Sequence, residues 1–424
     1  MSFLYCIKDP VPFIMLGGVS AIGKTTIVDY LLSNYKELFE QPISYTTRKK
    51  RNNNERYKFI SKEQIISLYK DGKIANLDEV YGEYYGVSVK SLKEIVKFGK
   101  IPVKEIHPNN FHKFKPKKSS QAISILIENR SDNKVDKNSK REGRPKVENW
   151  SDINSIDIKL NIAGLSVQKI VSQLFYRVIA FRRHISQYEH PNKIEAVNKY
   201  GYDQIAEEFE EGIRTTTKNF HDISFSFWKK QLDLIKVNEK VLEIGIGNGW
   251  LFSTLSVSTK EIYGADLSNK MHASYIKKMY SCSSRAIPIN AESIDYIVSS
   301  LADPFLYPET LVEAHRILKS GGKFIFTLPS LSWAKNLKTR KNVDKTTFKK
   351  LNGANISVYS ICNGVESMLD ILLILNMEIE LVHEMYLPEN YDVDISSAII
   401  DSANQQSKSV EDIPIVMGYV IKKQ

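Results

Sequence analysis

The hydrophobic positions of the chain form short apolar runs that alternate with longer stretches of helical spacing. The run over residues 11–17 predicts a strand, and Ile27, Leu31 and Leu38 lie on one face of a predicted helix over residues 24–39. The second half repeats this order, with strand patterns inside residues 239–250, 261–268, 292–300 and 321–330. Strands that alternate with helices in both halves predict an α/β fold with mainly parallel sheets.

The apolar periodicity weakens between the two halves. Residues 166–185 keep a helical period, whereas the period fades over residues 186–201 and Pro191 interrupts it. A chain of 424 residues also exceeds the usual size of one hydrophobic core. We therefore predict two domains and a linker, over residues 1–182, 200–424 and 183–199.

The composition indicates which kinds of ligand the chain could bind and in which cellular compartment it is expected. The net charge of +10 permits binding to polyanions, but the lysines are scattered, which favours phosphate-bearing small molecules over nucleic acid. Cys6, Cys282 and Cys362 show no paired spacing, which argues against a disulfide framework or a zinc site. The chain shows neither a signal-peptide pattern at its start nor an apolar run long enough to cross a bilayer. These patterns predict a soluble, cytoplasmic protein of undetermined oligomeric state.

The first glycine-rich loop carries the pattern G-x-x-x-x-G-K-[ST], in Gly18, Gly23, Lys24 and Thr25. Glycines let backbone N–H groups turn toward phosphate oxygens, and the start of the following helix adds positive potential. Lys24 would reach the terminal phosphates of ATP, and the Thr25 hydroxyl would bind Mg²⁺. The expected nucleotide-binding residues are Gly18, Ser20, Gly23, Lys24, Thr25 and Thr26.

The motifs downstream of this loop help to distinguish among the classes of phosphate-loop protein. The stretch "SYTTRKKR" at residues 44–51 is followed by "RYKFIS" and "VYGEYYGVS", which add tyrosines. With these motifs, residues 12–175 resemble the guanylate kinase family. The resemblance implies a P-loop nucleoside monophosphate kinase fold and phosphoryl transfer from ATP to a GMP-like acceptor. It also implies that the acceptor's monophosphate is held by Ser44, Arg48, Arg51, Tyr57 and Tyr85, whose guanidinium and phenol groups suit a phosphate dianion.

The same resemblance implies a lid that closes over the transferring phosphoryl group. Arg141 and Arg144, in the polar stretch over residues 129–150, would bring positive charge to this lid. Together with Lys24 and Arg48 they are the expected catalytic groups.

The chain departs from the family pattern at the acceptor base and at the metal. Where the family reads guanine with a glutamate, this chain has Asn76, and Val87 replaces a hydroxyl residue. An amide binds the guanine donors less well than a carboxylate, so the acceptor base stays open. Where the family has D-x-D, the chain has Glu105 and His107, so Glu105 is the expected carboxylate ligand of Mg²⁺.

The second glycine-rich loop, "VLEIGIGNGW", places Glu243 before Gly245, Gly247 and Gly249 at the end of a strand pattern. Asp266 ends the next apolar strand, where a carboxylate can accept hydrogen bonds from both ribose hydroxyls. With the later stretch "LVEAHRILKSGGKFIFTLPS", the chain from about residue 200 onward resembles the class I S-adenosylmethionine-dependent methyltransferases.

This second resemblance implies a Rossmann-like domain that binds S-adenosylmethionine. The glycines would turn beneath the methionyl part, Glu243 would support its amino group, and Asp266 would hold the ribose. Adenine contacts are expected at Ala291 and Glu292, and a cap helix is expected around Tyr202 and Phe209. The cofactor motifs do not reveal a catalytic base.

Taken together, the two resemblances predict a bifunctional enzyme. One half would phosphorylate a nucleoside monophosphate-like acceptor, and the other would methylate a small molecule. Two alternatives remain open from the sequence. The first half could only bind a nucleotide or partner and regulate the methyltransferase, or it could phosphorylate a ribose phosphate.

Overall fold

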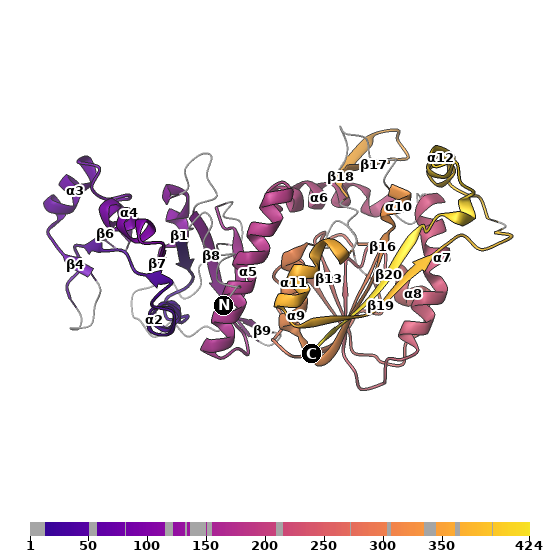
Figure 1. Ribbon diagram of the computed structural model, residues 1–424, viewed down its shortest axis with the longest axis horizontal. Coiled ribbons are helices and arrows are strands. Elements are labelled where there is room, and N and C mark those ends of the chain that lie inside the picture. The colour runs from indigo at the N-terminus through magenta and orange to yellow at the C-terminus, as the bar shows by residue number, and fades with distance from the viewer. Residues whose placement is uncertain are drawn as a thin grey trace. The chain divides into compact units, whose positions relative to one another are not determined.

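A computed structural model describes most of the chain and divides it into two compact units, residues 1–181 and 182–424 (Figure 1). The described residues are 13–50, 57–80, 82–114, 122–131, 134–135, 150, 155–208, 215–271, 273–302, 307–334, 345–360, 365–391 and 393–424. The segment predicted as a linker, residues 183–199, is mostly helical, because α5 (Val167–Gln187) ends in it and α6 (Pro191–Ile205) begins in it. The exact domain boundaries therefore stay a prediction.

The first unit is built on a parallel sheet with strand order β11-β8-β1-β7-β2. Its strands are β1 (Phe13–Gly17), β2 (Phe39–Glu40), β7 (Ile101–Glu105), β8 (Ala122–Glu128) and β11 (Ile158–Asn161). β1 and β8 are nearly continuous apolar runs and almost wholly buried, as expected for strands covered on both faces. The helices of this unit are α2 (Lys24–Asn34), α3 (Lys62–Lys70), α4 (Val89–Lys97) and most of α5.

A smaller sheet of the first unit carries the residues expected at the acceptor. Its strand order is β4-β3-β6-β5, and its strands are β3 (Ser44–Thr46), β4 (Tyr57–Phe59), β5 (Asp78–Val80) and β6 (Glu83–Val87). The unit also contains the short pair β9 (Arg130–Ser131) and β10 (Lys134–Val135) and the 3-10 helix η2 (Pro108–Phe114).

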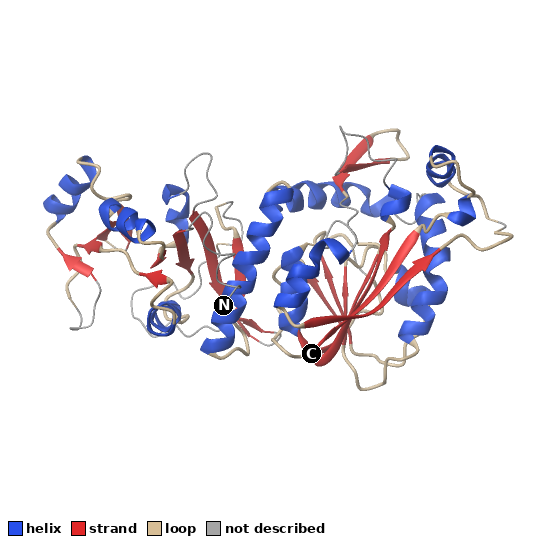
Figure 2. Cartoon of the chain, in the orientation of Figure 1, coloured by secondary structure: helices blue, strands red, loops and turns tan. Residues whose placement is uncertain are grey.

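The second unit is built on a mixed sheet with strand order β14-β13-β12-β15-β16-β20-β19 (Figure 2). The five strands from β14 to β16 are parallel, and β20 and β19 are antiparallel to their neighbours. The strands are β12 (Val241–Ile244), β13 (Ile262–Asp266), β14 (Lys278–Ser281), β15 (Ile294–Ser300), β16 (Leu318–Pro329), β19 (Met377–Met385) and β20 (Val416–Lys423). The prediction of an α/β fold with mainly parallel sheets in both halves is confirmed.

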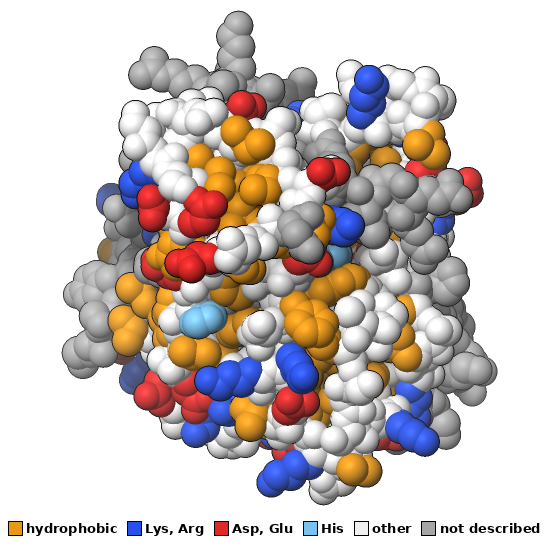
Figure 3. All heavy atoms as spheres, turned by 90° about the vertical axis from the view of Figure 1, so that its right-hand side faces the viewer, with side chains coloured by type: hydrophobic (Ala, Val, Ile, Leu, Met, Phe, Trp, Pro, Cys, Tyr) orange, Lys and Arg blue, Asp and Glu red, His pale blue; other side chains and the backbone are white. Residues whose placement is uncertain are grey.

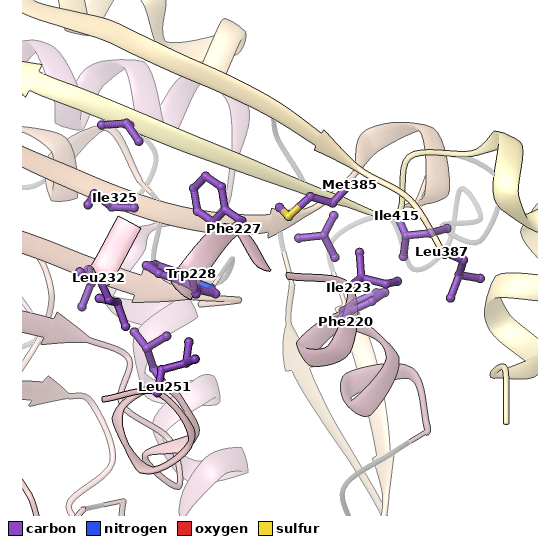
Figure 4. Close-up of a cluster of buried hydrophobic side chains, with 14 of the residues drawn as sticks. Phe220, Ile223, Phe227, Trp228, Leu232, Leu251, Ile325, Met385, Leu387 and Ile415 are labelled. Atoms are coloured by element: carbon purple, nitrogen blue, oxygen red, sulfur yellow. The ribbon is translucent and has the colours of Figure 1, made fainter. Parts of the chain in front are cut away.

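Helices pack on this sheet through a large apolar core. Phe220, Phe227 and Trp228 of α7 (Thr215–Leu232) lie against Ile325 of β16 and Met385 of β19 (Figure 4). The other helices are α8 (Trp250–Thr254), α9 (Pro308–Ile317), α10 (Leu331–Ala334), α11 (Leu369–Ile374) and α12 (Ser397–Gln405), with 3-10 helices η3 (Ala206–Glu208), η5 (Val365–Met368) and η6 (Val410–Asp412). Within the described ranges, no helix combines the length and apolar character needed to cross a membrane.

A β-hairpin, β17 (Lys345–Lys349) and β18 (Asn355–Tyr359), packs on α6. The buried side chain of Asn198 bonds both polar groups of one β18 residue. Its Oδ1 accepts the N–H of Tyr359 at 2.7 Å, and its Nδ2 donates to the Tyr359 carbonyl at 3.2 Å. Gly201 of α6 faces Val358 so closely that a Cβ would lie 2.4 Å from its Cγ1. The hairpin and the helix therefore form one packed element.

Candidate functional site

The phosphate loop of the first unit joins β1 to α2. Gly18 adopts φ 146°, and a Cβ there would lie 2.7 Å from the carbonyl oxygen of Ile127, so this position requires glycine. The Nζ of Lys24 donates to the carbonyls of Gly18 and Val19, each at 2.8 Å. No side chain caps the N-terminus of α2. Its N–H groups and the lysine together form a positive concavity that suits phosphate oxygens.

Glu105 ends β7, next to β1, where its backbone pairs with Leu16 just before the phosphate loop. Its Oε1 is buried and finds no hydrogen-bond partner in the described part of the chain. Thr25 lies exposed in the first turn of α2. Described residues offer no group of three or more histidine, cysteine or acidic side chains placed to hold a metal ion. Mg²⁺ commonly binds with few protein ligands beside phosphates and waters, so this orphaned oxygen fits it.

Two residues expected at the acceptor's phosphate, Arg48 and Tyr85, lie beside the ring of Tyr57. Tyr85 packs edge-on against that ring at 6.0 Å between centroids, and the guanidinium carbon of Arg48 lies 5.5 Å from its centroid. The ammonium of Lys104 lies closer, at 4.1 Å, and its side chain is 2% exposed. The sequence reasoning missed Lys104, although a lysine inside a buried strand was a visible signal. Two cations at one phenol form an anion-binding environment.

The positions expected to read the acceptor base are bonded to one another. Asn76 is 2% exposed, and its Oδ1 accepts the backbone N–H of Val87 at 3.0 Å. Its Nδ2 donates to Asp78 at 2.7 Å, and that carboxylate also accepts from Lys113 at 2.7 Å. The Ser44 hydroxyl donates to the nearby carbonyl of Pro42 at 3.2 Å. These polar groups are therefore satisfied without a ligand.

Several residues of the first half cannot be placed. Arg51, Arg141 and Arg144 lie outside the described residues, so their expected roles at the acceptor and the lid stay predictions. His107 packs edge-on against Trp150 at 5.4 Å between ring centroids, which gives it a structural contact.

The second unit contains a cavity of about 390 Å³ at the carboxyl ends of its parallel strands. β12 is flanked there by β13 and β15, which lie on opposite sides, so the cavity is at the switch point of the sheet. The predicted residues Glu243, Gly245, Gly247 and Asp266 line it. Gly249 adopts φ 78°, and a Cβ there would lie 2.4 Å from the Cβ of Ala273.

The two carboxyl groups of this cavity are buried and shifted. Burial raises the pKa of Glu243 to about 8, and the charge of Asp266 adds to this, while the Tyr275 hydroxyl, 3.0 Å from Oε2, opposes it. Burial also raises the pKa of Asp266 to about 6, although the N–H groups of Ser268 and Gly247 stabilise its charged form at 2.9 and 3.1 Å. A cationic ligand group beside these carboxyls would favour their ionised forms.

The shifted pKa of Glu243 predicts a pH-dependent stability. The neutral form is favoured in the fold, so the stability it contributes is complete below pH 4.5 and is lost as the pH rises through about 8. The loss can reach ~5 kcal/mol. A Glu243→Gln variant does not titrate there, so its unfolding midpoint should fall less than that of wild type between about pH 5 and pH 8.5. Calorimetry would measure the unfolding midpoint of the second unit, identified as the transition whose midpoint S-adenosylhomocysteine shifts. Asp233→Asn, at an exposed position, is the control. Equal slopes for E243Q and wild type would contradict the prediction.

The residues expected to contact adenine are not brought to the cavity. Ala291 and Glu292 precede β15 and therefore lie at its amino end, opposite the edge where the cavity opens. Glu292 instead adopts φ 52° and bonds the carbonyl of Arg316 through its N–H. The loop beside Asp266 begins at Cys282, because Asp266 pairs with the last residue of β14. A role of Ala291 and Glu292 at the adenine therefore finds no support in the cavity lining.

Sequence reasoning predicted some, but not all, of the other residues that line the cavity. Tyr202 lines the cavity from α6, as expected for a cap helix, whereas Phe209 lies outside the described residues. His221 of α7 also lines the cavity, with its ring stacked on Trp250 at 3.9 Å and 10°. Burial lowers the pKa of His221 to about 4. The sequence reasoning missed His221, since no motif surrounds it.

Comparisons with known proteins match both halves separately. Residues 11–157 match the family described as guanylate kinase, and residues 242–326 match one described as a methyltransferase domain. The guanylate kinase of Anaplasma phagocytophilum is 31% identical over 117 residues, 27% of this chain and 56% of that protein. The guanylate kinase of Mycoplasmopsis pulmonis is 32% identical over 122 residues, 27% of this chain and 62% of that protein. The chain thus spans little more than half of these relatives.

A solved structure described as a putative S-adenosylmethionine dependent methyltransferase from Listeria monocytogenes is 19% identical. The match has a TM-score of 0.35 and covers 48% of this chain and 97% of that one. The matched families imply the use of ATP and of S-adenosylmethionine. The chain joins a guanylate kinase domain, residues 11–157, to a methyltransferase domain, residues 242–326, consistent with a fusion protein.

Proposed function

We propose that the chain is a bifunctional transferase. Its first half transfers a phosphoryl group from ATP to a nucleoside monophosphate-like acceptor, and its second half methylates a small molecule. The observation that carries this proposal is that each half contains residues arranged to bind its own ligand. Lys24 lies inside a glycine-bounded phosphate loop, and Asp266 lies beside a glycine loop on a cavity of about 390 Å³.

In the kinase half, the chain's own groups position two phosphates and neutralise their charge. Lys24 and the N–H groups of α2 would hold the transferring end of ATP, while Arg48, Tyr57 and Tyr85 would hold the acceptor's phosphate. Bound Mg²⁺, held through Glu105 and Thr25, would supply further positive charge. Phosphoryl transfer depends almost entirely on such positioning and electrostatic stabilisation.

In the methyltransferase half, buried groups bind and orient S-adenosylmethionine, which supplies an electrophilic methyl group. The carboxylate of Asp266 would accept hydrogen bonds from the ribose hydroxyls, and Glu243 would ionise beside the ammonium group. The positive φ angles of Gly245 and Gly247 bring the backbone close to the ligand. Alignment of the methyl carbon with the acceptor accounts for most of the rate in such a transfer.

The acceptor of the kinase half is proposed to be recognised mainly through its phosphate. Support comes from Asn76, whose amide is committed to Val87 and Asp78, and from Lys104, which adds a cation beside Tyr57. These observations favour a second candidate within the same reaction, a ribose phosphate in place of a nucleotide.

An acceptor screen tests the kinase proposal. The full chain is given ATP, Mg²⁺ and one acceptor at a time (GMP, AMP, CMP, UMP or ribose 5-phosphate), and ADP release is measured. We expect turnover, with GMP within ~10-fold of the best other acceptor, because a missing carboxylate contact removes ~10–100-fold of discrimination. A GMP preference above ~100-fold would contradict phosphate-led recognition. ATP binding without ADP release for any acceptor would instead favour a regulatory module.

A further inference from the structure

The cavity of the second unit extends beyond the proposed S-adenosylmethionine site. β12 and β13 supply Glu243, the glycine loop and Asp266, whereas much of the remaining wall comes from residues at or after the ends of β15 and β16. Ser300, the last residue of β15, and Trp333 represent these two segments, and residues of α6, α7, α12 and the β17–β18 hairpin also line the cavity. If the proposed methyltransferase function holds, this second half of the cavity is where the methyl acceptor lies.

Aromatic side chains form much of this wall. Phe220 meets Trp333 edge-on at 4.9 Å between ring centroids, and Tyr202 meets Phe348 edge-on at 6.2 Å. Trp250 lies beneath the ring of His221. Flat π surfaces on several sides favour a planar aromatic ligand, which can stack on them or meet them edge-on.

Two polar atoms of the wall are buried and lack partners. The Nε1 of Trp333 and the Oγ of Ser300 make no hydrogen bond within the part of the chain that the structure describes. An indole N–H can only donate, and a serine hydroxyl can donate or accept. Buried polar groups are normally hydrogen-bonded, so each of these atoms is a candidate partner for a ligand oxygen. These two atoms therefore favour an aromatic ligand that carries an oxygen.

The charges around the cavity decide against a cationic acceptor. Of its described lining residues, the acidic ones are Glu243 and Asp266, and both belong to the proposed cofactor end. The charged side chain from the hairpin is Lys345, a cation. This arrangement favours a neutral or anionic acceptor over an ammonium compound.

His221 is placed to act on such an acceptor. Its ring lines the cavity, and its described contact is the stack on Trp250, with no hydrogen bond between a ring nitrogen and any described residue. Burial lowers the pKa of His221 to about 4, so the imidazole is neutral near pH 7. Such a weak base takes a proton only as the acceptor oxygen becomes acidic by bonding the methyl group.

We propose that the methyl acceptor is a planar aromatic compound bearing a hydroxyl group, and that His221 takes the proton of that hydroxyl. The acceptor oxygen would bond the methyl carbon while its O–H bond breaks and the proton forms an N–H bond on the imidazole. The electron pair of the former methyl–sulfur bond would stay on the sulfur, which gives S-adenosylhomocysteine. The imidazolium finally returns its proton to water.

Binding in the presence of S-adenosylhomocysteine tests the acceptor class. Ligand-observed NMR on the full chain compares catechol with cis-cyclohexane-1,2-diol, which lacks the ring, and with benzylamine, which is cationic. Catechol should bind at least ~10-fold more tightly than either, and Trp333→Phe should weaken catechol binding by a similar factor. Equal or tighter binding of the diol or the amine would overturn the proposal.

The role of His221 is tested by methylation of catechol with His221→Asn, with His383→Asn as a control on the exposed part of β19. His221→Asn should lower kcat by ~10²–10⁴-fold and leave KM and S-adenosylhomocysteine affinity within ~3-fold of wild type. An unchanged kcat would overturn the assignment, as would a wild type that binds S-adenosylhomocysteine but methylates no catechol. A wild type that fails to bind S-adenosylhomocysteine would instead overturn the proposed methyltransferase function.

Discussion

Replacing Lys24 with alanine is expected to lower ATP-dependent ADP release by ~10²–10³-fold, the typical cost of removing one preorganised group that stabilises a transition state. Its ammonium lies within 2.8 Å of two loop carbonyls, at the centre of the concavity where phosphates are expected. Alanine would remove that charge and leave the glycine turns intact. The measurement is initial-rate ADP release with the best acceptor of the screen.

Two further measurements make the Lys24 result specific. Lys36→Ala changes an exposed lysine just after α2 and should leave ADP release unchanged. Lys24→Ala should also keep the affinity of the second unit for S-adenosylhomocysteine. A Lys24→Ala protein that retains more than a tenth of wild-type ADP release would rule out phosphoryl transfer at this loop.

Replacing Asp266 with alanine is expected to weaken S-adenosylmethionine binding by ~10²–10³-fold, because hydrogen bonds to a charged group contribute ~1.5–3 kcal/mol each. The variant would lose the hydrogen bonds from the ribose hydroxyls to the carboxylate, and also those from the N–H groups of Gly247 and Ser268. Its pKa of about 6 adds a pH signature, since wild-type affinity should fall as the pH drops below that value. Titration calorimetry across pH measures both effects.

Matched variants separate recognition from damage to the loop. Asp266→Asn keeps one oxygen acceptor and should bind S-adenosylmethionine with intermediate affinity and little dependence on pH near 6. Asp401→Ala, on the exposed face of α12, should bind like wild type. If Asp266→Ala binds as tightly as wild type, the ribose lies elsewhere and the cofactor site must be sought in another part of the cavity.

The fold and the two loops could be predicted because their signals are local. A run of apolar residues, a glycine turn and a helical period follow one another in the chain, and the same residues meet in the structure as β1, the phosphate loop and α2. The helix was predicted to residue 39 but ends at Asn34, because the chain turns there to start β2 at Phe39. The residue at which a helix or strand ends depends more on the path of the chain in the folded protein than on periodicity.

The parts that could not be predicted depend on contacts between distant segments. Asn76 was recognised as a departure from the family, but its bond to Val87 exists only once β6 returns beside it. Lys104 meets Tyr57 across two sheets, and His221 of α7 meets Trp250 of α8. The spacing that suggested Ala291 and Glu292 did not show that both precede β15 and therefore lie at its amino end.

On the face drawn in Figure 3, acidic and basic side chains are interspersed rather than gathered by sign. This distribution agrees with the interpretation that the net charge of +10 is spread out, and it gives no support to a nucleic-acid surface on that face.

The β17–β18 hairpin supplies Lys345, Thr346 and Phe348 to the cavity. It is joined to α6 by the bonds of Asn198 to the N–H and the carbonyl of Tyr359 and by the close contact of Gly201 with Val358. The described contacts thus attach this ribbon to α6. If the second half methylates a small molecule as proposed, exchanges in the ribbon are expected to alter which molecules it accepts, so grafting the ribbon is a route to engineered variants with new substrates.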